Sequence, residues 1–275
     1  PILVTDIRRD NRFNRSERPD YKTKSFVSAP LIVEERVLGV INVIDKVSGD
    51  SFCETDVNLL CTIAGQVSIA VENARLYEAL EENCFNMVTA LAKSLEAKDK
   101  YTSGHSQRVA EYSSVMARTM GVSDKDMTTL RHAALLHDIG KIGISEFIIN
   151  KTDKLNDTEF ATIKSHPCQG EQIIKPLTFL DDAIHHIRSH HESFDGRGYP
   201  DRLGGDDLSL LTRIMTVADA FDAMTSDRTY RSSMKTNKAI SELRRVAGKQ
   251  FDPEVVDAFA SSEIVKMKSD LESNY

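Results

Sequence analysis

Seven side chains that can bind a metal ion stand where a hydrophobic core would not normally place them. The segment LLHDIGK puts His137 and Asp138 directly after an apolar helical run. Neighbouring helical side chains diverge by roughly 100°, so both can point inward only where the helix ends, and Gly140 provides that end. A buried imidazole and a buried carboxylate both need polar partners. The other candidates also lie, for the most part, at expected helix ends or within apolar segments: His105, His166, His190, His191 and Asp219.

The donor atoms of these side chains predict the kind of metal site. A lone core histidine is usually satisfied by a hydrogen bond, but five histidines and two aspartates on separate segments make that explanation inadequate. None offers sulfur, which excludes a finger-type structural zinc site and suits iron, manganese or zinc in a hydrolytic site. Seven donors exceed the need of one catalytic metal, so we expect two metals with a carboxylate between them. Two ions ~3.5–4 Å apart can hold a bridging hydroxide and clamp a phosphodiester for in-line attack.

The helix that ends on His190 and His191 is followed by an unusual loop, HHESFDGRGYP at 190–200. The two glycines and the proline of this loop exclude a helix interior. All eight histidines of the chain lie between 105 and 191, but three of them receive no ligand role. His185 and His186 are expected to be surface residues or neighbours of the ligands. His132 is unassigned.

Hydrophobic spacing predicts the elements that position these residues. β-branched residues dominate 25–45 and predict two strands around a short polar turn. Apolar residues then recur at three- and four-residue steps and predict a continuous helix over 55–98, roughly 65 Å long. Two helices joined near 82–84 are the alternative. A helix of this length buries its apolar stripe on a second copy of the chain or on flanking domains.

The last two thirds of the chain predict mostly helices. Pro167 disfavours helix at His166, so the preceding helix is expected to end there. Three polar residues stand where helices are expected to begin, each with a side chain that can cap the first turn: Ser123, Asn156 and Asp252.

Composition limits the class of protein. The 275 residues are 40% hydrophobic and 28% charged, which is typical of globular domains. The net charge of −7 excludes binding of a nucleic-acid polymer through an overall basic surface, so an anionic ligand needs a local cationic cluster. No stretch approaches ~18 apolar residues, so no membrane span is expected. Four cysteines without a CxxC pair predict reduced thiols and a cytoplasmic location, and the start at Pro1 predicts that a preceding piece is missing.

Three motifs together resemble the HD-GYP family of cyclic dinucleotide phosphodiesterases. They are HDIGK at 137–141, HHESFDGRGYP at 190–200 and ADAFDAMTSDRTYR at 218–231. The resemblance runs over roughly residues 85 to 265, and the motifs are long and ordered. The first 80 residues look like the C-terminal half of a GAF domain, a sensory fold, on pattern alone.

The resemblance implies a fold that is α+β overall. Its expected parts are a GAF-like α/β fragment at 1–75, a linker helix at 55–98 that overlaps the end of this fragment, and an all-α HD-type helical domain at 85–275. The linker helix is expected to form a parallel homodimer.

The resemblance also implies metal ligands at the seven residues selected above, with Asp138 as the bridge. Some members of the family bind a third metal through a carboxylate four residues before the first histidine. Tyr101 stands at that position here and is a poor ligand. We therefore expect two divalent metals, iron first and manganese next, while Asp99 leaves a third metal open.

The residues that contact the substrate phosphates are expected to form the local cationic cluster. Lys141 follows the HD pair and would neutralise or protonate the leaving oxygen, which makes it a catalytic residue beside Asp138. A solvated surface is the ordinary explanation for residues 227–231. The resemblance assigns them to a substrate phosphate instead, and the expected substrate contacts are Asp99, Lys141, Asp222, Arg228 and Arg231.

The implied activity is hydrolysis of cyclic di-GMP to pGpG, with GMP as a further product left open, by a metal-bridging hydroxide under control of the GAF-type sensor. Hydrolysis of another cyclic dinucleotide and a catalytically weak signalling module are the alternatives. Diguanylate cyclases of the GGDEF type, bound through the GYP loop, are a candidate partner. The sequence does not specify the ligand of the GAF part or the discrimination between cyclic dinucleotides.

Overall fold

The computed structural model describes residues 1–13, 24–96, 104–227 and 233–273. The chain divides into two compact units, Pro1–Cys84 and Phe85–Tyr275. Helix α1 (Glu54–Glu96) contributes residues to both units. No helix among the described residues is long and apolar enough to cross a membrane.

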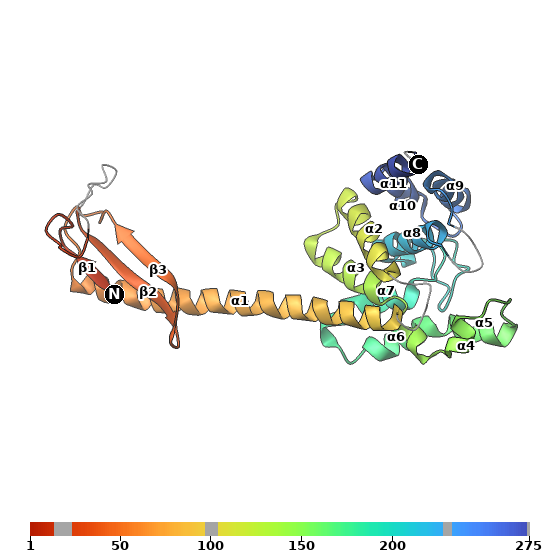
Figure 1. The fold of residues 1–275 in the computed structure, drawn as a ribbon, viewed down its shortest axis with the longest axis horizontal. Coiled ribbons are helices and arrows are strands. Elements are labelled where there is room, and N and C mark those ends of the chain that lie inside the picture. Colours follow the sequence, from red (N-terminus) through yellow and green to blue (C-terminus); the bar gives the residue numbers. More distant parts are fainter. Residues whose placement is uncertain (14–23, 97–103, 228–232, 274–275) are drawn as a thin grey trace. The chain divides into compact units, whose positions relative to one another are not determined.

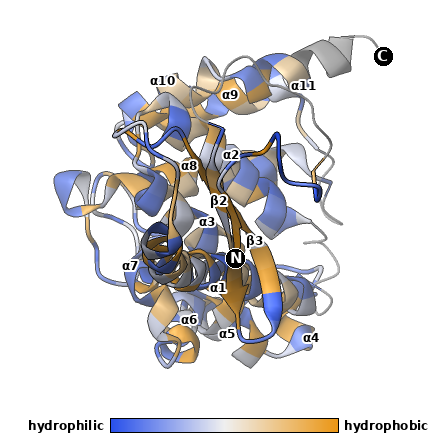
Figure 2. Cartoon of the chain, turned by 90° about the vertical axis from the view of Figure 1, so that its left-hand side faces the viewer, coloured by the Kyte–Doolittle hydropathy of each residue, from blue (hydrophilic) through white to orange (hydrophobic). Residues whose placement is uncertain are grey.

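The first unit is a small sheet that packs on the first half of α1 (Figure 1). Its strands β1 (Ile2–Val4), β2 (Phe26–Val33) and β3 (Arg36–Ile44) are antiparallel in the order β1-β2-β3. The two strands predicted over 25–45 are therefore confirmed. The core of this unit lies between β2 and α1 and contains Val27, Ala29, Phe52, Val57, Leu60 and Ala64. Figure 2 shows β2 and β3 largely in the colours of hydrophobic residues.

Helix α1 is one uninterrupted helix of 43 residues. It has no break at 82–84, so the alternative of two joined helices is wrong. Apolar side chains along it remain exposed within each unit, and several fall seven or fourteen residues apart: Ile63, Tyr77 and Leu91, and likewise Leu80 and Met87. Such a repeat is the pattern by which one helix packs along another.

The second unit is helical throughout its described part (Figure 1). Its centre is formed by α2 (His105–Thr119), α3 (Asp124–Leu136), α7 (Asp181–Ser189) and α8 (Leu210–Thr225). Their inner faces bury a continuous core that includes Met116, Leu130, Leu136, Ile187, Ile214, Met215 and Phe221. The predicted α+β fold with a C-terminal helical domain is therefore confirmed.

Shorter helices surround this centre. They are η1 (Ile139–Gly143), α4 (Glu146–Ile149), α5 (Asp157–Lys164), α6 (His166–Ile174), η2 (Thr178–Leu180), η3 (Gly205–Asp207), α9 (Thr236–Val246), α10 (Pro253–Ala260) and α11 (Glu263–Ser273). The three predicted caps are present: Ser123, Asn156 and Asp252 each accept a backbone N–H of the helix they begin. Pro167 follows the first residue of α6, where its missing N–H costs no helical hydrogen bond.

Candidate metal centre

The structure brings all seven predicted ligands together. Two groups of three have ligand atoms within 4.8 Å of one another, namely His105, His137 and Asp219, and His166, His190 and His191. Asp138 lies between these groups. Its Oδ2 is 3.5 Å from Nε2 of His137, and its Oδ1 is 3.3 Å from Nε2 of His166. The carboxylate thus faces both groups at once, as a bridging ligand must.

Most of these ligands stand at helix ends, as the sequence predicted. His105 begins α2, His137 follows α3, and His190 follows α7. Gly140 explains how two of these ends approach each other. A Cβ atom at this position would lie 1.9 Å from the carbonyl oxygen of His166, so only glycine allows η1 to pack against the start of α6.

Hydrogen bonds to the backbone fix the orientation of three of the histidine rings. Nδ1 of His137, His166 and His190 lies 2.7–2.8 Å from the carbonyl oxygen three residues earlier in the chain. A carbonyl oxygen can only accept, so each Nδ1 carries the proton and donates it. Each Nε2 then keeps its lone pair, and these nitrogen atoms point into the site.

The separation of two of these nitrogen atoms tests whether a metal fits. Nε2 of His166 lies 3.1 Å from Nε2 of His190. Burial lowers the pKa of both imidazoles, so both are neutral and their lone pairs face each other. Two facing lone pairs repel unless a cation binds both. The separation is shorter than twice a metal–nitrogen bond of about 2.0–2.1 Å, so one ion can bind both atoms.

Both carboxylates of the site are held in their ionised form. Burial raises the pKa of Asp138, but the nearby positive charge lowers it well below its ordinary value. The ammonium of Lys141 contributes most to this lowering, and its Nζ is 2.7 Å from Oδ2 of Asp138. Asp219 is likewise held well below its ordinary pKa, against burial, chiefly by the hydrogen bond from His105.

A carboxylate contacts the Nδ1 side of the His105 ring, and a guanidinium contacts that carboxylate in turn. Its Nδ1 lies 2.7 Å from Oδ2 of Asp222, and Nε of Arg108 donates to Oδ1 of the same residue at 2.6 Å. Burial lowers the pKa of His105, but Asp219 and Asp222 raise it to about 10. A metal ion held at Nε2 of His105 would have to displace a proton. Asp222 is fully buried with both oxygen atoms engaged, so it orients a ligand. The direct substrate contact expected of Asp222 from the sequence stays a prediction.

The loop after His191 is held in place by a buried carboxylate. Oε1 of Glu192 accepts the backbone N–H groups of Asp201 and Arg202 at 2.6 and 2.9 Å. Gly198 packs against the same residue, because a Cβ there would lie 2.4 Å from Cα of Glu192. Gly196 has a φ of +74°, in the region that favours glycine. The predicted need for glycine in this loop is confirmed at both positions.

Tyr199 of this loop stacks on a ligand and brings a cation to the site. Its ring centroid is 4.9 Å from that of His191, with 30° between the two planes. The ammonium of Lys164 lies 4.9 Å from the Tyr199 ring and 4.8 Å from the ring of Phe160. Among the described residues Lys164 makes these ring contacts without a carboxylate partner. Its charge remains available to an anionic ligand.

Several predicted residues lie elsewhere. Asp99, Tyr101, Arg228 and Arg231 lie outside the described residues. The three histidines without a ligand role are outside the ligand groups: His132 contacts aromatic rings, His186 contacts Thr212, and His185 contacts His186.

The sequence interpretation missed three charged residues near the site: Glu96, Arg108 and Lys164. Arg108 had a weak signal, since it lies three residues after a ligand and so on the same side of a helix. Glu96 and Lys164 had no local signal, because their contacts join segments that are separate in the sequence.

Comparison with known proteins gives the family of the helical unit. The family model described as HD domain matches residues 89–255, more than half of the chain. This chain belongs to the HD domain family. The predicted family is thereby confirmed, and a GAF domain model matches residues 1–71.

Relatives of this HD domain protein include proteins named as phosphodiesterases. 3'3'-cGAMP-specific phosphodiesterase 3 of Vibrio cholerae is 44% identical over 168 residues, which cover 61% of this chain and 36% of that protein. 3'3'-cGAMP-specific phosphodiesterase 2 of Vibrio cholerae is 30% identical over 257 residues, covering 93% of this chain and 49% of that protein. A cyclic di-GMP phosphodiesterase of Thermotoga maritima is 37% identical over 187 residues, which cover 66% of this chain and 50% of that protein. The chain spans half or less of the length of these relatives.

A solved structure supports the fold of the HD domain. Bd1817, a HDG"Y"P protein from Bdellovibrio bacteriovorus, superposes with a TM-score of 0.50 and 24% identity. The match covers 64% of this chain and 53% of that chain. At this identity the likeness concerns the fold alone.

Proposed function

We propose that this chain is a metal-dependent phosphodiesterase that hydrolyses the phosphodiester bonds of cyclic di-GMP to pGpG, with GMP as a second product. The observation that carries the proposal is the pair of three-residue ligand groups with Asp138 between them. This arrangement suits two divalent ions, and a two-metal site is a recurring solution for phosphodiester cleavage. Iron is proposed first and manganese next, because all donors are imidazole nitrogen or carboxylate oxygen.

A second cyclic dinucleotide is favoured by the comparisons. The relative with 44% identity is named as specific for 3'3'-cGAMP. This dinucleotide has the same two phosphates as cyclic di-GMP and differs in one base. The metal ligands cannot distinguish the two, so a choice between them must come from residues that contact the bases.

The residues of the site divide into those that hold metals and those that act on the substrate. His105, His137 and Asp219 would hold one ion, the three histidines of the other group would hold the second, and Asp138 would contact both. When bound, the two ions supply Lewis acidity that activates water and neutralises phosphate charge. The buried ligand groups exclude bulk water from one side of the site, so the substrate must enter from the side of Asp219 and His191, which are less buried.

Lys141 is the proposed proton donor for the leaving oxygen. Its ammonium contacts Asp138 at 2.7 Å, so it stands next to the bridging position and stays protonated there. An ammonium at this place can give its proton to, or neutralise, the alkoxide that forms when the phosphodiester bond breaks.

The substrate phosphates need further cations because the protein as a whole is acidic, with a net charge of −7. We keep Arg228 and Arg231 as proposed phosphate contacts and Asp99 as a proposed substrate contact on the family resemblance. We add Lys164, whose ammonium lies over Tyr199 beside the ligand His191.

Regulation and assembly complete the proposal. The exposed apolar repeat along α1 supports a homodimer through this helix. The GAF domain at residues 1–71 supports a sensory input that reaches the HD domain through α1. The GYP loop at 190–200 is the proposed surface for a GGDEF-type partner.

The proposal can be tested on protein purified without oxygen. The metal content would be measured by mass spectrometry, and cyclic di-GMP, 3'3'-cGAMP and cyclic di-AMP would each be offered as substrate. We expect two ions per chain and hydrolysis of at least one guanine-containing cyclic dinucleotide. An Asp138→Ala variant should lose at least one ion and all turnover. Hydrolysis of none of the three by protein that holds two ions would contradict the proposed function.

A further inference from the structure

Helix α2, which begins on the metal ligand His105, lacks the usual cap. The residue before it, Gly104, has a φ of +71° and no side chain. A serine or aspartate could not take its place without strain, since a Cβ would lie 3.0 Å from Nη1 of Arg108 and the backbone lies in the left-handed region. The first N–H groups of α2 therefore need an acceptor from another segment.

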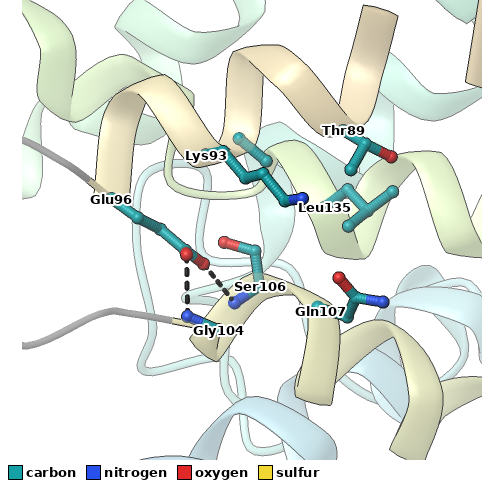
Figure 3. A pocket seen from close by; sticks show the side chains of 8 residues that line it. Thr89, Lys93, Glu96, Gly104, Ser106, Gln107 and Leu135 are labelled. Atoms are coloured by element: carbon teal, nitrogen blue, oxygen red, sulfur yellow. Dashed lines mark hydrogen bonds between the residues drawn. The ribbon is translucent and has the colours of Figure 1, made fainter. Parts of the chain in front are cut away.

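Glu96, in the last turn of α1, supplies that acceptor. Its Oε2 accepts the N–H of Gly104 at 2.7 Å, and its Oε1 accepts the N–H of Ser106 at 3.0 Å. Figure 3 shows both bonds reaching from the end of α1 to the start of α2. The two donors are the residues on either side of His105. The N–H of Ser106 belongs to the peptide group that follows the ligand, and the N–H of Gly104 lies one peptide group before it, so one carboxylate holds the backbone on both sides of His105. The negative charge also lies at the positive end of the α2 dipole.

The position of Glu96 is set by packing within the second unit. Val88, Ala92 and Leu95 of α1 are 0, 3 and 4% exposed, so the end of α1 is part of the core. A cavity of about 580 Å³ beside Glu96 is lined by Thr89, Lys93, Gln107 and Leu135 among others. Packing therefore fixes the backbone of Glu96, whereas the cavity leaves room for its side chain to turn away from α2. The two hydrogen bonds keep the carboxylate at the start of α2.

We infer that Glu96 is a positioning residue for the metal ligand His105 and is the point at which α1 acts on the metal centre. Asp222 fixes the ring of His105 from one side, and Glu96 fixes its backbone from the other. The inference rests on the proposed metal centre. It concerns one ligand group only, because the other group lies at the start of α6 and directly after α7, and neither of these segments takes part in the bonds of Glu96: His166, His190 and His191.

The test is a titration of the chelator-stripped full chain with Mn²⁺, followed by calorimetry. Wild type should show two sites. Glu96→Ala should weaken one site roughly tenfold, the lower end of the usual loss when the support of a ligand is removed, and leave the other unchanged. Glu96→Gln keeps one acceptor oxygen and should weaken the same site by less, which keeps the test valid if the alanine variant folds poorly.

Two control variants separate positioning from general damage. Ser123→Ala removes the cap of α3 at the end remote from His137, and Lys93→Ala changes the same cavity without touching α2. Both should retain two sites of wild-type affinity. Wild-type binding by both Glu96 variants would overturn the inference, and so would equal weakening of both sites. Absence of Mn²⁺ binding in the wild type would instead overturn the proposed metal centre.

Discussion

Gly140→Ala is expected to damage the metal centre through the backbone alone. The added methyl group would lie 1.9 Å from the carbonyl oxygen of His166 and 2.6 Å from the backbone nitrogen of Gly170. Both contacts are with backbone atoms, which cannot rotate away as a side chain can. Relief requires α6 to move away from η1 by more than 1 Å, roughly the shortfall from ordinary contact, and His166 would move with it.

The size of the effect follows from this overlap. Overpacking of a core with side-chain relief costs about 1–3 kcal/mol, and a clash with two backbone segments belongs at or above the top of that range. For a unit of this size about 3 kcal/mol corresponds to a fall in Tm of roughly 6–12 °C. Displacement of His166 should also weaken the binding of an ion by the group that it forms with His190 and His191.

A matched control lies three residues further along η1. A Cβ at Gly143 would lie 2.4 Å from Oε1 of Gln169, the far end of a flexible side chain that can move. Gly143→Ala should therefore cost less than about 1 kcal/mol and leave metal content unchanged. Thermal unfolding of both variants, with and without a chelator, measures the difference. Equal Tm values for the two variants would refute the argument that the α6 backbone is held against Gly140.

Three further predictions concern turnover, substrate binding and assembly. Lys141→Met should retain metal and lose turnover at saturating substrate by about 10²–10⁴-fold, since it removes the proposed proton donor; loss of metal instead would show that Lys141 has a structural role. Lys164→Met should raise KM for the cyclic dinucleotide about tenfold with kcat unchanged, and an unchanged KM would exclude contact between this ammonium and the substrate. Leu80→Glu, on the exposed repeat of α1, should convert a dimer into a monomer in light scattering, whereas Glu78→Gln should not; a monomeric wild type would contradict assembly through α1.

The metal ligands were predictable because their positions are unusual locally. His137 and Asp138 follow an apolar helical run, and His190 and His191 precede a loop that cannot be helical. The caps at Ser123 and Asn156 were predictable for the same reason, since donor and acceptor lie three residues apart.

The supports of the ligands were not predictable, because they join distant segments. Arg108 contacts Asp222, which is 114 residues away. Glu96 contacts the start of another helix, eight and ten residues further along the chain. The part that Asp222 plays in orienting His105 was not predictable for this reason. Asp222 lies one helical turn from Asp219 and so shares its face, but only the tertiary structure shows that Arg108 and His105 occupy both of its oxygen atoms.

The central claim is that this chain holds two metal ions bridged by Asp138. X-ray absorption spectroscopy of the anaerobically purified protein, combined with its metal content, tests this claim most directly. The account predicts two ions per chain, nitrogen and oxygen ligands without sulfur, and a metal–metal scattering path at about 3.5–4 Å that is absent from Asp138→Ala. A single ion per chain, or two ions without that path in the wild type, would contradict it.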